Sequence, residues 1–281
     1  MVEKEISQYS LDREELAAIE KQLTIEVGLH YIAIIEVVTA SESITAVELF
    51  TFNKFEHNWY QIFQEVRLQS ILFDINYASK QIFINGFQQT IIPEKFYKND
   101  LTHHFLQILH GWKSNDLNYD GIYIQNKQIY IASQLPADLR QMFHVSFSEI
   151  PVYNSLRKQI ETALKLGSEF QNYWHIQFYP GSFSIVSLQQ QQLHLAESYC
   201  YTCVEDIIFR LVSILNTYNM QTLPLKVHIS GILHESDEMH TAIKKLIPDV
   251  QWQPGFKGEQ ILIEKNYYPE HYLQPFFNVV L

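Results

Sequence analysis

Two cysteines, Cys200 and Cys203, lie where a β-like segment gives way to a helical one. A Cys-x-x-Cys pair at the start of a helix can have a lowered thiol pKa and exchange disulfides. The rest of a thioredoxin-like pattern is missing, and no second pair completes a four-cysteine zinc site. We therefore expect ordinary buried or semi-buried thiols, and a redox-active pair is the alternative.

The chain contains 12 His. His103 and His110 fall on one predicted helix, but no His-Glu-x-x-His motif occurs and no ligand spacing supports a metal site. His228 lies on a strand that we expect to be buried, where a hydrogen-bonded core histidine is the common outcome. Ser230 follows that strand without the Gly-x-Ser-x-Gly elbow that exposes a nucleophile. We expect no metal site and no catalytic residue among these side chains.

Glycine is scarce, with 9 Gly in 281 residues. Loops that cradle phosphates need glycine, because the backbone must approach the ligand and adopt positive φ. Neither Gly-x-Gly-x-x-Gly nor Gly-x-x-x-x-Gly-Lys-Ser/Thr occurs in the chain. The sequence therefore excludes the standard dinucleotide-binding fingerprint and the P-loop.

The composition is that of an acidic globular protein, with 47% apolar residues, 18% charged residues and a net charge of −11. An acidic balance argues against binding to nucleic acid or to anionic membrane, because both need a positive field. No signal peptide and no membrane-spanning apolar run is present in the sequence. We expect a cytoplasmic protein that has a protein partner.

Hydrophobic periodicity indicates alternating groups of strands and helices. The strands are predicted at 23–27, 31–39, 44–52, 71–75, 81–85, 90–92, 174–178, 183–188, 193–199, 225–232 and, as a hairpin, within 121–132. The helices are predicted at 54–68, 100–110, 136–143, 152–170, 204–216 and 236–246. The order β-β-β-α-β thus appears twice, from about residue 23 and from about residue 173. Two hairpins followed by a helical crossover fit a mixed sheet with helices on its faces.

We divide the chain at the boundaries of this repeat. Residues 1–20 have a short helical pattern and are predicted to be an N-terminal arm, and 21–150 form the first half. Residues 151–172 are predicted to be a connecting helix, and 173–281 form the second half. The aromatic, apolar C-terminal segment is expected to dock on the body of the protein, with an intermolecular contact as the alternative.

A duplicated β-β-β-α-β-α unit resembles the ribonuclease H-like fold, and two such halves resemble the actin-like ATPase superfamily. Individual segments are similar to a bacterial family of uncharacterised proteins, domain of unknown function 3822. These segments are 23–27, 90–93, 178–181 and 201–206. The resemblance implies an α/β protein with two ribonuclease H-like halves and a degenerate actin-like architecture. No function is attached to that family.

The resemblance also implies where a nucleotide would bind. In the ATPases of the superfamily, an Asp-x-Gly turn in each half holds phosphates and handles Mg²⁺. Here the first turn has Glu26 and Gly28, and the second keeps Gly181 but has Tyr179 in place of the carboxylate. The adenosine turn keeps one glycine, Gly231. The nucleotide site is thus degraded at two of three positions, and the glycines can equally be simple turn residues.

Two functions follow from the resemblance. The first is a non-catalytic cytoplasmic scaffold or interaction protein without cofactors. The alternative is a nucleotide-dependent switch or phosphotransferase that binds ATP and Mg²⁺ between its halves. In that alternative, Glu26 holds Mg²⁺ through water, while Gly28, Gly181 and Gly231 line the phosphates and the base.

Overall fold

The computed structural model describes residues 1–10, 19–53, 58–97, 102–111, 118–124, 127–147, 149–220, 223–256, 261 and 268–281. The chain forms two compact units. The first contains Met1–Arg157, Phe256–Glu264 and Val279–Leu281, and the second contains Lys158–Gly255 and Lys265–Asn278. Each unit is described below by itself.

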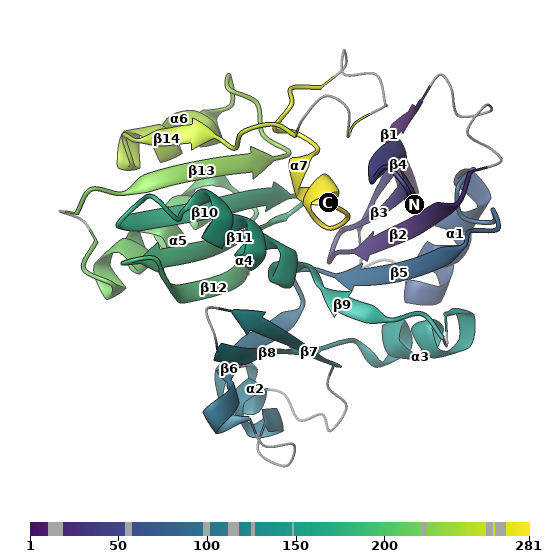
Figure 1. Ribbon diagram of the computed structural model, residues 1–281, viewed down its shortest axis with the longest axis horizontal. Coiled ribbons are helices and arrows are strands. Elements are labelled where there is room, and N and C mark those ends of the chain that lie inside the picture. Colours follow the sequence, from purple (N-terminus) through teal and green to yellow (C-terminus); the bar gives the residue numbers. More distant parts are fainter. Residues whose placement is uncertain are drawn as a thin grey trace. The chain divides into compact units, whose positions relative to one another are not determined.

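The first unit is built on a six-stranded mixed sheet with the order β1-β4-β3-β2-β5-β9 (Figure 1). Its strands are β1 (Val2–Tyr9), β2 (Lys21–Val27), β3 (Tyr31–Val38), β4 (Ser43–Phe52), β5 (Ser79–Ile84) and β9 (Val152–Asn154). The neighbours β1, β4, β3 and β2 are antiparallel, whereas β2, β5 and β9 are parallel. The parallel pairs follow from crossover connections, since β5 is reached through a helix.

Helices α1 (Trp59–Gln69) and α3 (Ala137–Ser146) cover one face of this sheet. Apolar residues recur at helical spacing on α1, and Trp59 is fully buried against the strands. The Asn58 side chain begins the helix by accepting from the Gln61 backbone N–H, at 2.9 Å. The predicted helix over 54–68 is therefore confirmed from residue 59, and 54–57 lie outside the described residues.

The predicted N-terminal arm is wrong for Val2–Tyr9, which form strand β1 and pair with β4. The strand carries Lys4 at the position where its ladder is irregular, and the Lys4 ammonium reaches the buried Glu48 carboxylate at 2.7 Å. A charged residue in that place breaks the apolar alternation by which a strand is recognised. Residues 11–18, which carried most of the helical pattern, lie outside the described residues.

The strand predicted at 71–75 is also wrong, because these residues form turns after α1. The Ser70 hydroxyl accepts from the backbone N–H groups of Leu72 and Phe73, each at 3.1 Å. A serine side chain that satisfies two successive amides favours a turn over a sheet ladder.

A small three-stranded sheet, with the order β6-β8-β7, is inserted between β5 and α3. It consists of β6 (Gln88–Pro93), β7 (Asn118–Ile124) and β8 (Lys127–Gln134), with the 3₁₀ turn η3 (Glu94–Phe96) and helix α2 (Thr102–His110). The sequence predicts this helix and hairpin but not their separate sheet. Gly111 ends α2 with φ of 75°, as expected for a C-terminal glycine.

Asn154 joins this small sheet to the main one. Its amide nitrogen donates to Gln89 Oε1 and to Ser133 Oγ, both at 2.7 Å. Its amide oxygen accepts from the Leu156 backbone N–H at 2.9 Å and so caps α4 (Ser155–Leu166). The helix predicted over 152–170 therefore begins three residues late, because Val152–Asn154 pair with β5.

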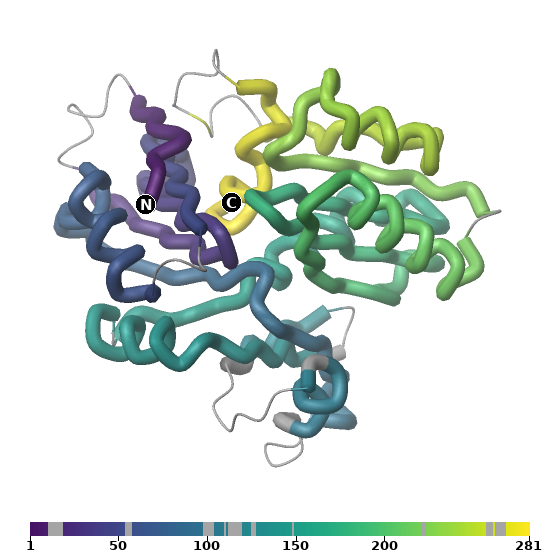
Figure 2. Tube along the Cα trace, turned by 180° about the vertical axis from the view of Figure 1, so that it is seen from behind, coloured from purple at the N-terminus to yellow at the C-terminus, as the bar shows by residue number. Residues whose placement is uncertain are grey.

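The second unit repeats the arrangement, with a five-stranded sheet in the order β12-β11-β10-β13-β14. Its elements are β10 (Asn172–Tyr179), β11 (Ser182–Gln189), β12 (Gln192–Cys200), α5 (Val204–Thr217), β13 (Lys226–Gly231), α6 (Glu238–Leu246) and β14 (Val250–Trp252). Helices α5 and α6 pack on the apolar face of the sheet (Figure 2). On the other face, Gln159 of α4 donates to the backbone carbonyls of His175 and Ser184.

Both main sheets share one topology. Counted from the first hairpin of each unit, the strands lie in the spatial order third, second, first, fourth, fifth, with β1 added beside β4 in the first unit. The predicted duplication is therefore confirmed. His228 is also as predicted, since its ring is buried and its Nδ1 lies 2.9 Å from the Tyr173 hydroxyl.

Of the described residues near the C-terminus, 268–278 belong to the second unit. Helix α7 (Gln274–Asn278) is buried throughout, and the Phe276 ring meets the Tyr179 ring with centroids 5.7 Å apart. The expectation that this segment docks on the protein's own body is confirmed. Among the described helices, none is long and apolar enough to span a membrane.

Candidate functional site

Three parallel strands of the first unit end at one edge of their sheet. The register pairs Val27 of β2 with Ile84 of β5, and Ile84 with Asn154 of β9. Glu26, Asn85 and Ser155 therefore lie near the carboxyl ends of the three strands. This is the edge at which open α/β sheets usually bind ligands.

The Glu26 side chain is fully buried at this edge. Its Oε1 accepts from Asn85 Nδ2 at 3.3 Å, and the same amide donates to the Tyr31 hydroxyl oxygen at 2.8 Å. Glu26 Oε2 has no hydrogen-bond partner among the described residues. Burial raises the pKa of Glu26 to about 7, although Ser155, Tyr31 and Asn85 oppose the rise.

A carboxyl group with such a pKa is about half protonated at pH 7 and is largely protonated below that pH. A protonated carboxyl is a poor ligand for Mg²⁺, which prefers anionic oxygen. The described residues contain no group of three or more His, Cys, Asp or Glu that could hold a metal ion. The surroundings of Glu26 therefore favour a neutral hydrogen-bonding group over a ligand for Mg²⁺.

Replacing Glu26 with glutamine is expected to make the protein more stable at alkaline pH. The folded pKa of about 7 exceeds the ordinary value of 4.5, so the folded state holds the proton more tightly. The stability from this proton is complete below pH 4.5 and is lost as the pH rises through 7. Relative to wild type, Glu26→Gln should gain up to about 3 kcal/mol at pH 8 and little at pH 4.5.

Urea denaturation of both proteins at several pH values measures this difference. Burial also raises the pKa of Glu197 to about 7, so the pH profile of the wild type alone is ambiguous. Glu197→Gln is the matched control, because it removes the other carboxyl that titrates near pH 7 and leaves the contribution of Glu26 unchanged. An equal gain for Glu26→Gln at pH 5 and pH 8 would contradict the assignment.

Gly28 follows Glu26 in the first hairpin turn, and its backbone N–H donates to the Tyr31 carbonyl at 2.9 Å. A Cβ atom at Gly28 would lie 2.0 Å from the Tyr31 ring. Tyr31 is fully buried, so the ring cannot move away freely. The packing of Tyr31 is therefore sufficient to explain this glycine.

Gly181 occupies the second hairpin turn with φ of 68°, a conformation that favours glycine. Beside it, the Tyr179 ring is covered by Phe276, and the Tyr201 hydroxyl donates to the Tyr179 carbonyl at 3.1 Å. The position that carries a carboxylate in the ATPases is thus occupied here by a buried aromatic ring.

Gly231 ends β13 beside β10, where its register partner is Phe178. Its φ is 105°, and a Cβ atom would lie 2.0 Å from the Phe178 carbonyl oxygen. Its backbone N–H donates to the His271 carbonyl at 2.8 Å, and His271 Nε2 lies 2.8 Å from the Leu233 carbonyl. The C-terminal segment therefore occupies the polar groups of this turn.

The four candidate residues fall into two pairs. Glu26 and Gly28 lie together in the first unit, and Gly181 and Gly231 lie at one end of the second sheet.

The sequence profile of a family described as "Protein of unknown function (DUF3822)" matches residues 13–250. The chain belongs to this family. Among proteins with curated descriptions, none matches it.

Similar solved structures identify the fold of the DUF3822 chain. A Bacteroides thetaiotaomicron VPI-5482 protein "with actin-like ATPase fold and unknown function" is 15% identical with a TM-score of 0.71, over 82% of this chain and 90% of that one. A chain of the "PilM-PilN type IV pilus biogenesis complex" is 10% identical with a TM-score of 0.61, over 92% and 96%. The chain therefore has a two-half, actin-like α/β fold.

Sequence reasoning missed the neighbours of Glu26. Tyr31, Asn85 and Ser155 are separated along the chain and meet only because β2, β5 and β9 are adjacent. Asn85 gives the one visible signal, because it is a polar residue directly after an apolar strand.

The two cysteines correct another expectation, since both are exposed free thiols rather than buried ones. Desolvation raises the pKa of the Cys200 thiol. The pKa of Cys203 is also raised: a backbone hydrogen bond from Asp206 lowers it, but the other contributions, including a side-chain hydrogen bond with Glu205, outweigh that effect. A raised pKa reduces the thiolate fraction on which disulfide exchange depends.

Proposed function

We propose that this protein is a non-catalytic interaction module that keeps an actin-like fold and works without nucleotide. The observation that carries this proposal is the C-terminal segment at Gly231. The Gly231 N–H, which the resemblance assigns to the base-binding turn, already donates to His271. A nucleotide at this turn would have to displace the segment of which the buried helix α7 is a part.

The charges around the other turns support the same function. Mg²⁺ bound to a triphosphate needs carboxylate ligands or carboxylate-bound water. Glu26 is buried with a pKa near 7 and Tyr179 carries no charge. The Gly28 N–H is also committed to the Tyr31 carbonyl.

A protein is the class of partner that we propose. One similar solved structure is described as a complex, the PilM-PilN type IV pilus biogenesis complex. An actin-like chain in a protein complex supports an interaction role for a chain of this fold. The net charge of −11 is unfavourable for nucleic acid.

Thermal melting with and without ATP and Mg²⁺ tests this function. We expect the melting temperature to change by less than about 1 °C at millimolar ATP and Mg²⁺. A bound ligand at 100 times its dissociation constant would add about 2.7 kcal/mol, which melting readily detects. ADP, and Mg²⁺ alone, serve as the reference conditions.

A stabilisation of several degrees that needs both ATP and Mg²⁺ would overturn the proposal in favour of the nucleotide-dependent switch. Loss of that stabilisation in Glu26→Gln would then assign the metal to Glu26. Gly28→Val is unsuitable for this purpose, because the new side chain would collide with Tyr31 whether or not nucleotide binds.

A further inference from the structure

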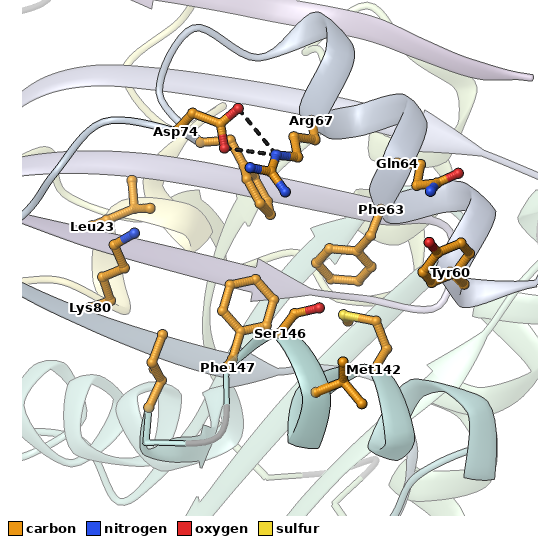
Figure 3. A pocket seen from close by; sticks show the side chains of 13 residues that line it. Leu23, Tyr60, Phe63, Gln64, Arg67, Asp74, Lys80, Met142, Ser146 and Phe147 are labelled. Carbon is orange, nitrogen blue, oxygen red and sulfur yellow. Dashed lines mark hydrogen bonds and ion pairs between the residues drawn. The ribbon is translucent and has the colours of Figure 1, made fainter.

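A pocket of about 430 Å³ opens in the first unit between α1, α3 and the starts of β2 and β5 (Figure 3). It lies at the end of the sheet opposite to Glu26, since Leu23 and Lys80 stand near the beginnings of their strands. Its size is within the range of ordinary ligand pockets. The site is therefore separate from the turns discussed above.

The floor of the pocket is aromatic and fixed. The Phe147 ring lies 6.0 Å from the Phe63 ring and 5.9 Å from the Phe73 ring, and the last two are 6.3 Å apart. Phe63 and Phe147 belong to the main core and are only 6% and 9% exposed. Rings held from behind by a packed core need no ordering when an apolar group binds to them.

The mouth of the pocket is cationic. Arg67 pairs through its Nε with Asp74 at 2.8 Å, and the side chains are 62% and 60% exposed. The terminal amino groups of Arg67 donate to none of the described residues. The Lys80 ammonium lies 5.9 Å from the centroid of the Tyr77 ring and forms no ion pair with a described residue. Figure 3 shows Lys80 on the wall that β5 contributes. Two cations and one anion leave a local positive charge on a chain whose net charge is −11.

The two helices beside the pocket present exposed apolar side chains. Tyr60 of α1 is 61% exposed and Val145 of α3 is 74% exposed, and both line the pocket. Apolar groups around a pocket extend the contact area beyond what a small molecule covers. This favours a polypeptide as the occupant.

We propose that this pocket binds an acidic segment of a partner protein. The segment places one aromatic or large aliphatic side chain on the phenylalanine floor and a carboxylate beside Lys80 and Arg67. Neighbouring residues of the segment contact Tyr60 and Val145 on the rim. The proposal rests on the proposed interaction function, and charge complementarity with an apolar floor identifies the occupant.

The test is a selection from displayed random peptides of about 12 residues, a length suited to one groove, against the full-length protein. We expect enriched peptides with Phe, Trp or Leu next to Asp or Glu. The strongest peptide, labelled for fluorescence anisotropy, should bind Lys80→Glu and Arg67→Glu at least about tenfold more weakly. Ser146→Trp, which fills the exposed mouth, should weaken binding without a change of charge.

Lys244→Glu is the matched control, because it makes the same charge change at an exposed position of α6 in the second unit. It should leave the affinity within about twofold of wild type. Melting curves of all variants show whether each is folded, so that lost binding is not confused with lost structure.

Three outcomes would overturn the proposal: no enrichment over Lys80→Glu protein, enriched peptides that are basic, or affinities that the pocket variants leave unchanged. Equal affinity for 3-phenylpropionate alone would show a small-molecule site instead. A doubled mass in solution that Ser146→Trp abolishes would show that a second copy occupies the pocket. Peptides that bind away from the pocket would contradict the pocket proposal but not the proposed interaction function. Stabilisation by ATP and Mg²⁺ would contradict the interaction function itself.

Discussion

Replacing Gly231 with alanine is expected to lower the free energy of unfolding by about 4 kcal/mol or more. The new methyl group would stand 2.0 Å from the Phe178 carbonyl oxygen and 2.7 Å from the Phe178 nitrogen. Both are backbone atoms inside a parallel strand pair, so neither can rotate out of the way. Alanine would also have to adopt φ of 105°, which L residues rarely do.

Gly111→Ala is the matched control for this prediction. Gly111 also has positive φ, 75°, but a Cβ atom there would meet nothing within 4 Å. Its expected cost is the conformational one alone, about 1 kcal/mol. Urea denaturation followed by tryptophan fluorescence compares the two. Similar costs would show that strain, and not the close approach of β10 and β13, makes Gly231 necessary.

Replacing Glu48 with alanine is expected to cost about 3–5 kcal/mol, the usual cost of breaking a buried ion pair. The Glu48 carboxylate is completely buried. It accepts from Lys4 Nζ at 2.7 Å, from the Ile71 backbone N–H at 3.2 Å, and from the hydroxyls of Tyr9 and Ser70. Its loss would leave a cavity, an ammonium group and two hydroxyls without their partner.

The control is Glu5→Ala on the same strand pair, because Glu5 is exposed and, among the residues that the structure describes, accepts only from Thr51 Oγ1, at 2.9 Å. We expect it to cost less than about 0.5 kcal/mol. The double variant Lys4→Met/Glu48→Met should recover part of the loss, since neither charge then remains buried alone. If Glu48→Ala costs no more than Glu5→Ala, β1 is not held by this carboxylate.

Glu48 also shows which strands could be predicted from the sequence and which could not. Strands such as Leu23–Val27 and Phe183–Leu188 are recognisable because each is apolar or alternating and is bounded by turn residues. Strand β1 is not recognisable, since Lys4 stands where an apolar residue is expected. Lys4 occupies this position because it pairs with Glu48, which is 44 residues away along the chain. A local pattern contains no information on a partner at that distance.

The candidate sites also depend on contacts between residues that are far apart in the sequence. The resemblance predicts the positions of Glu26 and Gly231 because turn residues form local motifs. It does not predict that Asn85, 59 residues from Glu26, shares the Glu26 environment. Nor does it predict that Arg67 and Lys80 border one pocket, because α1 and β5 become neighbours only in the folded chain.

Asn154 has a mechanical consequence. One amide group holds two strands of the inserted sheet through its nitrogen and the first turn of α4 through its oxygen. A tilt of the insert and a fraying of that first turn are therefore coupled motions, because each pulls on the same planar group. Load applied to the insert is therefore transmitted through this amide group to the start of α4.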